Sequence, residues 1–442
     1  MMGERFIIGA MRIGVKDRER RGGSWRFLIS IMLTVPQFGV AEDKLVTPDA
    51  LSLMSSAASP GDTFVIKNGT YLDQNLELRG KGTAQAPITI TTETPGKVIF
   101  VGKSTIELIG EHVVIDGLRF AGGAASQKPL ISIQGTHCRV TNSVIAGAEA
   151  PGSGQPGDQS WILLSGDYHR IDYCTFSKKA SPGPVVMIRR VVGKEDHHEV
   201  MSNHFLRRLA GSAGRSYETI CIGSSAESES SSFTTIKSNL FEECDGEDSL
   251  LSVNAGKCLI LDNTFRGCGG LLDLRYGGGT RVERNLFAGL RKQGAGGIRV
   301  RGADHQILGN AFIGLTGRGG GALSLMTGVA DPGREGDRRA ENIFAKGNLF
   351  AANLGPAICL DERYGQDNHS LLPRGIRLLG NVLSGDDLAK LVVGGDKLGL
   401  ELSSEKNQIF ANNQIPKDIT RAFAPPLTKV DVGAAWYRDQ IL

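Results

Sequence analysis

The sequence predicts an all-β protein folded as a single-domain parallel β-helix, with loops on one flank that form a groove. Three observations predict this fold class. A motif recurs along the chain, its apolar segments are short and lack a helical period, and glycine is abundant, at 59 of 442 residues. Short β-branched apolar segments are typical of strands, and scattered glycine is typical of tight turns.

The chain is expected to begin with an export signal at residues 1–41. A basic stretch precedes the apolar run FLISIMLTV, and Gly39-Val40-Ala41 resembles a cleavage site. The apolar run is too short to span a bilayer comfortably. We therefore expect a periplasmic or extracellular protein of residues 42–442, without a membrane anchor after the signal is removed.

The repeat consists of two or three apolar residues, a polar spacer and then Asn-x-Phe or a close variant, as in TTIKSNLF, CLILDNTF and TRVERNLF. Periods of this length indicate a repeat architecture. The expected asparagine-equivalent positions are 116, 142, 174, 203, 239, 263, 285, 310, 348, 381 and 412.

The shortest repeat, 22 residues from position 263 to 285, fits three short strands and three turns. The leucine-rich-repeat pattern is absent, and a propeller blade would need four strands. The apolar residue after each asparagine should stack inside, and the asparagines should form a hydrogen-bonded ladder in a turn. The longer gaps, 203–239 and 310–348, should carry loops, among them the Ser-rich stretch 223–233, which is expected to be solvated.

The rungs are expected from about residue 61 to about residue 414, and residues 415–442 should cover the open end of the coil. The hydrophobic fraction of 40 % supports a buried core and excludes a disordered chain. Residues 1–41 carry a net charge of +4, so the mature chain is close to −1, which gives no reason to expect a nucleic-acid partner. We expect a monomer. The seven cysteines include no CxxC pair, and Cys244 and Cys268, one rung apart, are expected to be stacked free thiols.

Several stretches resemble one known family. They are GDTFVIKNGTYLDQNLELRGKGTAQAPITITTETPGKVIFVG, VVIDGLRF, YETICIG, NLFEECDGEDSLLS, NTFRGCGGLLDLRYG, GGIRVRGADHQILGNAF and LTKVDVGAAWY. Together they are similar to the polysaccharide lyases of family six, which include chondroitinase B and several alginate lyases. The resemblance implies a right-handed parallel β-helix that cleaves an anionic uronic-acid polysaccharide, of the alginate or the chondroitin/dermatan sulfate type, by β-elimination.

The elimination removes the C5 proton of a uronate, which requires neutralisation of its carboxylate, a base, and an acid for the departing O4. The resemblance implies a calcium ion held by an asparagine and a Glu-x-Glu pair, a lysine base and an assisting arginine. The arginine is present as Arg275 and the first glutamate as Glu247. The second glutamate falls on Ser249, and the lysine falls on Asn254.

These departures leave three interpretations open. In the first, the protein is an active lyase: Tyr276 or Lys257 serves as base or acid, and Asp245 or Asp248 joins Glu247 at a calcium ion. In the second, it binds the polyanion without cutting it. In the third, Asp245, Glu247 and Asp248 form a hydrolase pair with Asp273.

Basic residues are concentrated between positions 275 and 301, where seven Lys or Arg stand against one acidic residue. On stacked rungs they are expected to line one groove suited to carboxylates or sulfates. The expected substrate-binding residues are Arg291, Arg299, Arg301 and His305, of which His305 also suits a turn.

Overall fold

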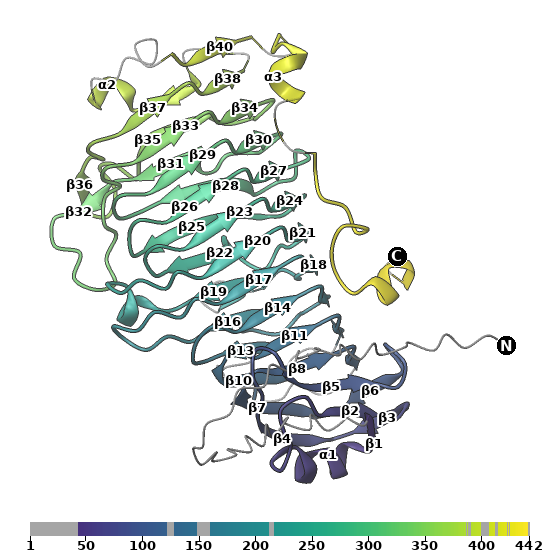
Figure 1. Cartoon of the computed structure of the whole chain (residues 1–442). Helices are drawn as coiled ribbons and strands as arrows, with labels where there is room; N and C mark the ends of the chain where they lie inside the picture. Colours follow the sequence, from purple (N-terminus) through teal and green to yellow (C-terminus); the bar gives the residue numbers. More distant parts are fainter. Residues whose placement is uncertain are drawn as a thin grey trace, which may run out of the picture. The chain divides into compact units, whose positions relative to one another are not determined.

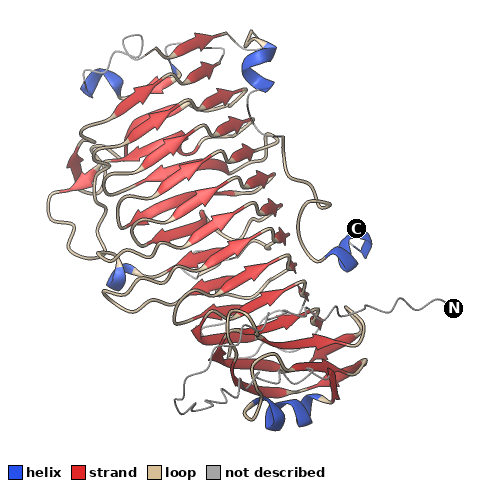
Figure 2. Ribbon diagram, in the orientation of Figure 1, coloured by secondary structure: helices blue, strands red, loops and turns tan. Residues whose placement is uncertain are grey.

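A computed structural model of the chain describes residues 43–121, 128–147, 160–211, 216–385, 387, 390–398, 406–411, 414–421, 423 and 425–440. The predicted export signal and position 412 of the predicted ladder lie outside the described residues. The described chain winds through successive coils of three short strands, and each coil stacks on the one before it (Figures 1 and 2). This is the parallel β-helix that the repeat predicts.

Three parallel sheets form the walls of the coil, because every third strand pairs with its equivalent in the next rung. Sheet A consists of β1 (Asp43–Val46), β2 (Thr63–Ile66), β5 (Ile88–Thr92), β8 (Val113–Asp116), β11 (Arg139–Thr141), β14 (Arg170–Asp172), β17 (Glu199–Met201), β20 (Thr235–Lys237), β23 (Leu259–Leu261), β26 (Arg281–Glu283), β29 (Gln306–Leu308), β33 (Phe344–Lys346) and β37 (Arg377–Leu379). Sheet B consists of β3 (Gly69–Leu72), β6 (Val98–Val101), β9 (Arg119–Ala121), β12 (Val144–Ala146), β15 (Thr175–Ser177), β18 (His204–Leu206), β21 (Leu240–Glu242), β24 (Thr264–Arg266), β27 (Leu286–Ala288), β30 (Ala311–Ile313), β34 (Leu349–Ala351), β38 (Val382–Ser384) and β40 (Gln408–Phe410). Sheet C consists of β4 (Asn75–Lys81), β7 (Thr105–Glu111), β10 (Ile131–Thr136), β13 (Ile162–Leu164), β16 (Val186–Ile188), β19 (Ile220–Ile222), β22 (Ser249–Asn254), β25 (Gly270–Tyr276), β28 (Ala295–Val300), β31 (Arg318–Met326), β35 (Ile358–Glu362) and β39 (Val392–Val393).

The turn between sheets A and B holds the predicted asparagine ladder. Each amide oxygen accepts the backbone N–H and the side-chain N–H of the asparagine one rung before it, as Asn285 does from Asn263, with both distances at 2.9 Å. Each amide nitrogen also donates to a backbone carbonyl, so these buried groups are fully bonded. The ladder runs through Asn203, Asn239, Asn263, Asn285, Asn310, Asn348, Asn381 and Asn407.

Two predicted ladder positions, 116 and 142, were wrong. Strand pairing aligns Phe120 with Ile145, which places Leu118 and Ser143, rather than positions 116 and 142, in register with the ladder. Among the described residues the ladder continues to Asn407, because Gln408 pairs with Val382 on the preceding rung. The motif fails at 116 and 142 because no asparagine stands at the ladder position itself, which holds Leu118 in one turn and Ser143 in the next.

Phenylalanine rings fill the coil two residues after the ladder positions, as predicted. From Phe176 to Phe350 seven rings stack with their centroids 4.6–5.0 Å apart. Valine, isoleucine and leucine from the three sheets complete a core that continues along the coil. All seven cysteines are free and buried, as expected for Cys244 and Cys268.

Short helices lie at both ends of the coil (Figure 1). Helix α1 (Pro48–Ser55) buries Leu51 against the first rung, and Pro48 begins it because its fixed φ suits the first helical position. At the far end, two short helices, α2 (Gly395–Leu398) and α3 (Lys417–Arg421), lie near the last rungs (Figure 1). No helix among the described residues is long and apolar enough to cross a membrane.

The predicted C-terminal cover is only partly found. Ile415, Ile419 and Phe423 pack against the last rungs, but the chain then turns back along sheet B (Figure 1). Residues up to η4 (Ala435–Gln440) follow this flank, and the indole N–H of Trp436 donates to the carbonyl of Asn142 at 2.9 Å. Backbone N–H groups of the segment also donate to the stacked turns, as Gly433 does to the carbonyl of Ser202 at 2.9 Å.

Two long loops project where sheet C turns into sheet A, in the two gaps where loops were predicted. Loop 223–233 contains η1 (Ser225–Glu227) and follows β19. Loop 327–341 follows β31, and its β32 (Gly328–Val329) pairs with β36 (His369–Leu371). Figure 1 shows loop 327–341 reaching along the coil toward η1.

Candidate functional site

The residues around Asn254 and Arg275 belong to the central strands of sheet C. On β22, β25 and β28 alternate side chains point into the coil, where Leu251, Leu272 and Ile298 are buried. The intervening residues face outward, because successive side chains of a strand alternate between its two faces. Strand pairing therefore brings Ser252, Asp273, Arg299 and Ser324 side by side on the outer face.

Asp273 is the centre of an ion-pair network on this face. Its carboxylate accepts a hydrogen bond from the Ser249 hydroxyl at 3.0 Å and lies 3.3 Å from an Arg301 nitrogen and 3.7 Å from an Arg299 nitrogen. Arg299 also pairs with Glu362 at 2.9 Å. Two of the expected substrate-binding arginines are thus already paired with carboxylates of the protein.

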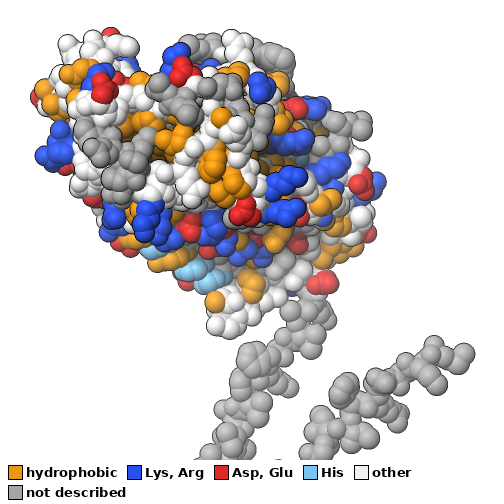
Figure 3. Space-filling view, turned by 90° about the horizontal axis from the view of Figure 1, so that it is seen from above, with side chains coloured by type: hydrophobic (Ala, Val, Ile, Leu, Met, Phe, Trp, Pro, Cys, Tyr) orange, Lys and Arg blue, Asp and Glu red, His pale blue; other side chains and the backbone are white. Residues whose placement is uncertain are grey.

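The network also fixes loop 327–341. Asp337 lies 3.1 Å from the Nε atom of Arg301, and it also contacts Arg363 at 3.4 Å and His369 at 3.0 Å. In the view along the coil, basic side chains lie in several small groups with acidic side chains among them (Figure 3). The basic run of the sequence does not form one uniformly positive surface, because Asp273, Asp337 and Glu362 come from other rungs.

Arg275 differs from its basic neighbours. Its side chain is exposed, and its guanidinium lies 5.6 Å from the ring centroid of Tyr276. No described carboxylate forms an ion pair with it. Arg275 faces outward like Asp273, two residues before it, because side chains alternate along β25. The register between β22 and β25 shifts just before Asn254 pairs with Tyr276, which leaves Arg275 without a partner on β22. An exposed, unpaired guanidinium suits a carboxylate or sulfate ligand.

Tyr276 and Asn254, the neighbours of Arg275, are less available to a ligand, because both are buried and hydrogen-bonded within the protein. Tyr276 is buried, and its hydroxyl donates to the carbonyl of Glu335 at 2.7 Å. Asn254 is also buried, and its amide nitrogen donates to the Gly223 carbonyl and the Ser252 hydroxyl, both at 3.2 Å. At the family's lysine position this chain therefore holds an amide that anchors the start of loop 223–233.

Lys257 lies at a different place, past the end of β22 in the turn to sheet A. Its backbone adopts a left-handed conformation with φ of 56°, and its ammonium lies 5.2 Å from the ring centroid of Phe233. It lines a cavity beneath the two long loops rather than the open face of sheet C.

The three predicted calcium ligands do not converge. Asp245 accepts from Lys292, with both oxygens 2.6 Å from the ammonium, and Asp248 is exposed and paired with Arg318. Glu247 accepts the backbone N–H of Tyr217 at 3.2 Å. Within the described part of the chain, no three His, Cys, Asp or Glu side chains are grouped as a metal would require. The three carboxylates do not form one calcium site, because Asp245 and Asp248 are each paired with a cation of the protein, Lys292 and Arg318.

Glu247 instead lies beside Glu218. Burial, together with the Glu218 carboxyl group, raises the pKa of Glu247 to about 8. Glu218 itself accepts a 2.5 Å hydrogen bond from Ser216. The hydrolase interpretation finds no support, because Asp245, Asp248 and Asp273 are each held by different cations.

His305 and Arg291 do not lie with Arg275. His305 is fully buried: its Nδ1 accepts the N–H of Thr280 at 3.1 Å, and its Nε2 bonds the carbonyl of Arg301 at 3.0 Å. Burial lowers the pKa of His305 to about 4, so the neutral ring holds a turn, and the expectation of a substrate contact is corrected. Arg291 is exposed in the turn from sheet B to sheet C, at the opposite end of the strands.

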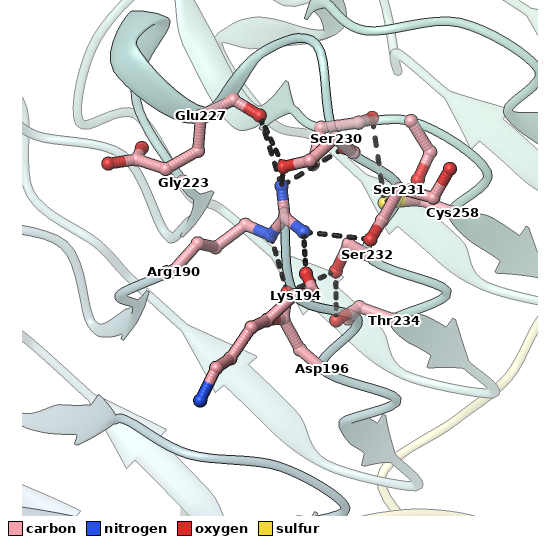
Figure 4. A network of polar contacts seen from close by, with 12 residues as sticks. Arg190, Lys194, Asp196, Gly223, Glu227, Ser230, Ser231, Ser232, Thr234 and Cys258 are labelled. Carbon is pink, nitrogen blue, oxygen red and sulfur yellow. Dashed lines mark hydrogen bonds and ion pairs between the residues drawn. The ribbon is translucent and has the colours of Figure 1, made fainter. Parts of the chain in front are cut away.

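Sequence reasoning missed Arg190, which organises loop 223–233. Its side chain is fully buried and pairs with Asp196 at 2.5 Å (Figure 4). Its other two nitrogens donate to backbone carbonyls, including those of Glu227, Ser230 and Ser231. The Ser-rich loop is therefore bonded to a buried cation rather than simply solvated. The available signal was an arginine directly after a buried apolar strand, where a charge requires partners.

Comparison with known proteins supports the expected family. The family model described as chondroitinase B matches residues 48–416. Comparison with curated protein sequences gives no match.

Three solved structures are similar over most of the chain. A mannuronic acid specific polysaccharide family 6 lyase from human gut microbiota is 24 % identical, with a TM-score of 0.77 over 90 % of this chain and 97 % of that one. The PL6 family alginate lyase AlyGC is 28 % identical, with a TM-score of 0.69 over 84 % of this chain but only 50 % of that one. A PL6 alginate lyase in complex with a trisaccharide is 20 % identical, with a TM-score of 0.70 over 85 % of this chain and 88 % of that one.

Proposed function

Because the chain belongs to the chondroitinase B family, we propose that it binds anionic uronic-acid polysaccharides on the outer face of sheet C and cleaves them by β-elimination. The observation that carries the proposal is Arg275, an exposed arginine without a carboxylate partner among the described residues, at the position of the family's arginine. Alginate is the first candidate substrate, because structures similar in fold include alginate lyases. A polysaccharide of the chondroitin or dermatan sulfate type is the alternative.

Arg275 would act on the carboxylate of the sugar that loses its proton. The guanidinium donates paired hydrogen bonds to a carboxylate, and the neutralised carboxylate makes the C5 proton easier to remove. A base takes that proton, a double bond forms between C4 and C5, and the C4–O4 bond breaks as O4 is protonated. No step is assigned to calcium, because Asp245 and Asp248, two of the three carboxylates expected to hold it, are paired with Lys292 and Arg318.

Tyr276 is the proposed proton-transfer residue. It adjoins Arg275, and a phenol can donate a proton to O4 or, once ionised, accept one from C5. Its hydroxyl is bonded to the carbonyl of Glu335, so proton transfer requires loop 327–341 to release it. Cleavage is therefore expected to be slow relative to binding.

A second candidate function is binding without cleavage, and Asn254 favours it. An amide cannot take the C5 proton, because its nitrogen is not basic and its oxygen is a weak acceptor. The Asn254 amide is also engaged with Gly223 and Ser252. In this case Arg275 would still hold the polymer, but no product would form.

The test is incubation of the purified protein with polymannuronate, polyguluronate, chondroitin sulfate and dermatan sulfate, with and without a chelator. Elimination creates an unsaturated uronate whose ultraviolet absorbance reports turnover. Turnover that Arg275→Ala reduces supports the lyase. Binding without turnover supports the second candidate, and neither binding nor turnover contradicts both.

We also propose export, since the substrates are extracellular polymers. The mature protein would begin at Glu42. Mass measurement of the protein recovered from periplasm or medium checks this, and an intact N-terminus there would contradict it.

A further inference from the structure

A cavity of about 550 Å³ lies beneath the two long loops, beside the turns from sheet C to sheet A. Loop 223–233 and loop 327–341 form its walls, and successive rungs form its floor. This volume is in the range of sites that hold small organic ligands. The floor is almost free of side chains, and the following glycines form it: Gly256, Gly277, Gly278, Gly279 and Gly302.

The glycine floor permits close approach of a ligand ring to the backbone. Gly277, Gly279 and Gly302 have φ of 70–81°, a conformation that disfavours other residues. A Cβ atom at Gly278 would lie 2.9 Å from the carbonyl of Ala303. The turns therefore require glycine for their own geometry, and the same glycines leave the cavity open.

The two loops that form the walls are joined to each other, although about 110 residues separate them. Arg338 pairs with Glu229 at 2.6 Å, and the Ser225 hydroxyl lies 3.4 Å from an oxygen of Glu335. Loop 327–341 is also tied to sheet C by the contact of Glu335 with Tyr276. The wall formed by loop 327–341 is thus attached both to loop 223–233 and to sheet C.

The wall formed by loop 223–233 is held from inside. Arg190 donates to the carbonyls of Ser230 and Ser231, two residues that line the cavity, at 3.1 and 2.8 Å (Figure 4). Arg190 is fixed in turn by the buried Asp196. A cavity with walls fixed before the ligand arrives loses less entropy on binding.

Lys257 gives the cavity its charge preference. The two arginines that line it are neutralised, since Arg338 pairs with Glu229 and Arg339 pairs with Glu341 at 3.2 Å. Lys257 has no carboxylate partner among the described residues. Its ammonium lies 5.2 Å from the ring centroid of Phe233, the last of five rings stacked along this edge: His112, His137, Tyr168, His197 and Phe233.

We propose that this cavity is a second saccharide site, which binds one or two uronate units with their carboxylate on Lys257 and their hydroxyl groups on the lining carboxylates. Glu229, Asp304 and Glu341 line the same space and can accept hydrogen bonds from hydroxyl groups. A small inorganic anion could pair with Lys257, but it would be repelled by these three carboxylates and has no hydroxyl groups to donate to them. The choice of uronate as the ligand rests on the proposed function. The cavity itself, and the position of Lys257 in it, do not depend on that function.

The experiment measures binding of dimannuronate by calorimetry to the full-length mature protein and to three variants. Lys257→Gln removes the charge and keeps most of the stem. Lys178→Gln is the matched control, because Lys178 is also exposed, has φ of 64° and donates its backbone N–H to the next rung. Arg275→Ala separates this cavity from the face of sheet C. Uncharged mannobiose tests whether the carboxylates are needed.

Lys257→Gln should weaken dimannuronate binding about ten-fold or more, which is typical of a lost charge-assisted hydrogen bond, while Lys178→Gln binds as the wild type does. Mannobiose should bind both the wild type and Lys257→Gln weakly. Dimannuronate should also protect the Lys257 amine from acetylation, as read by mass spectrometry of the peptides.

Two results overturn the proposal: unchanged binding by Lys257→Gln, or acetylation of Lys257 that dimannuronate does not slow. If only Arg275→Ala weakens binding, the proposed function stands and the second site fails. If Lys257→Gln weakens dimannuronate binding while no polymer is cleaved or held through Arg275, the second site stands and the proposed function fails.

Discussion

Replacement of Arg275 by alanine tests how the polysaccharide is held. The side chain is exposed and has no described carboxylate partner, so its loss leaves no buried charge unpaired and should not unfold the protein. A charge-assisted hydrogen bond contributes roughly 1.5–3 kcal/mol. Because the site is open to solvent, we expect the lower end of this range, which corresponds to about ten-fold weaker binding.

The assay is calorimetric titration of the wild type and Arg275→Ala with a mannuronate oligomer at low and at moderate salt. Arg281→Ala is the control, because Arg281 lies on β26 of sheet A and pairs there with Glu283. Arg275→Ala should bind about ten-fold more weakly and show less dependence on salt, because one fewer ionic contact is screened. Equal affinities of the wild type and Arg275→Ala would refute the reasoning, as would an equal loss in Arg281→Ala.

Four further perturbations have defined outcomes. Arg190→Met should destabilise the fold by about 3–5 kcal/mol in urea denaturation, because Asp196 is left buried and unpaired. The double change Arg190→Met with Asp196→Asn should recover part of this loss of stability. If it recovers none, loss of the Arg190–Asp196 ion pair is not the cause of the destabilisation. Asn285→Ala should cost about 1–3 kcal/mol on the same assay, because neighbouring ladder groups lose their partners; an unchanged denaturation midpoint would contradict the ladder's role. The pKa of Glu247 is raised to about 8 from an ordinary value of 4.5, so the folded state holds this proton more tightly than the unfolded state does. The free energy of unfolding should therefore fall as pH rises through this interval, and Glu247→Gln should flatten the fall in melting temperature between pH 5 and 8. An equal fall in wild type and variant would exclude Glu247 as its cause. Asn254→Lys should raise the rate of polymannuronate cleavage by supplying an amine beside Arg275. If the wild type already cleaves quickly, and Asn254→Ala cleaves as quickly, then the site does not lack a base.

The repeat in the sequence was sufficient to predict the coil, because each rung repeats the same local requirements. A short apolar strand, an asparagine turn and an inward phenylalanine recur, and every asparagine from Asn203 to Asn381 lies where the motif predicts. Individual registers were less certain. The ladder positions next to Asp116 and Asn142 hold Leu118 and Ser143 rather than asparagine, and pairing with neighbouring rungs was needed to find them.

The site could be predicted only in part, because its side chains are paired across distant rungs. Arg299 and Arg301 suggested a basic groove, but their partners Glu362 and Asp337 come from segments far along the chain with no motif of their own. Asp245 suggested a calcium ligand, but it pairs with Lys292, two rungs on. Composition shows which charges are present, whereas the stacking of the rungs decides which of them neutralise each other.

The most direct test of the central claim is the time course of ultraviolet absorbance when the mature protein is mixed with polymannuronate, with Arg275→Ala measured in parallel. The account predicts a slow, steady rise for the wild type, insensitive to a chelator, and little or no rise for Arg275→Ala. A flat trace for the wild type on every uronic-acid polymer, together with no measurable binding to any of them, would contradict it.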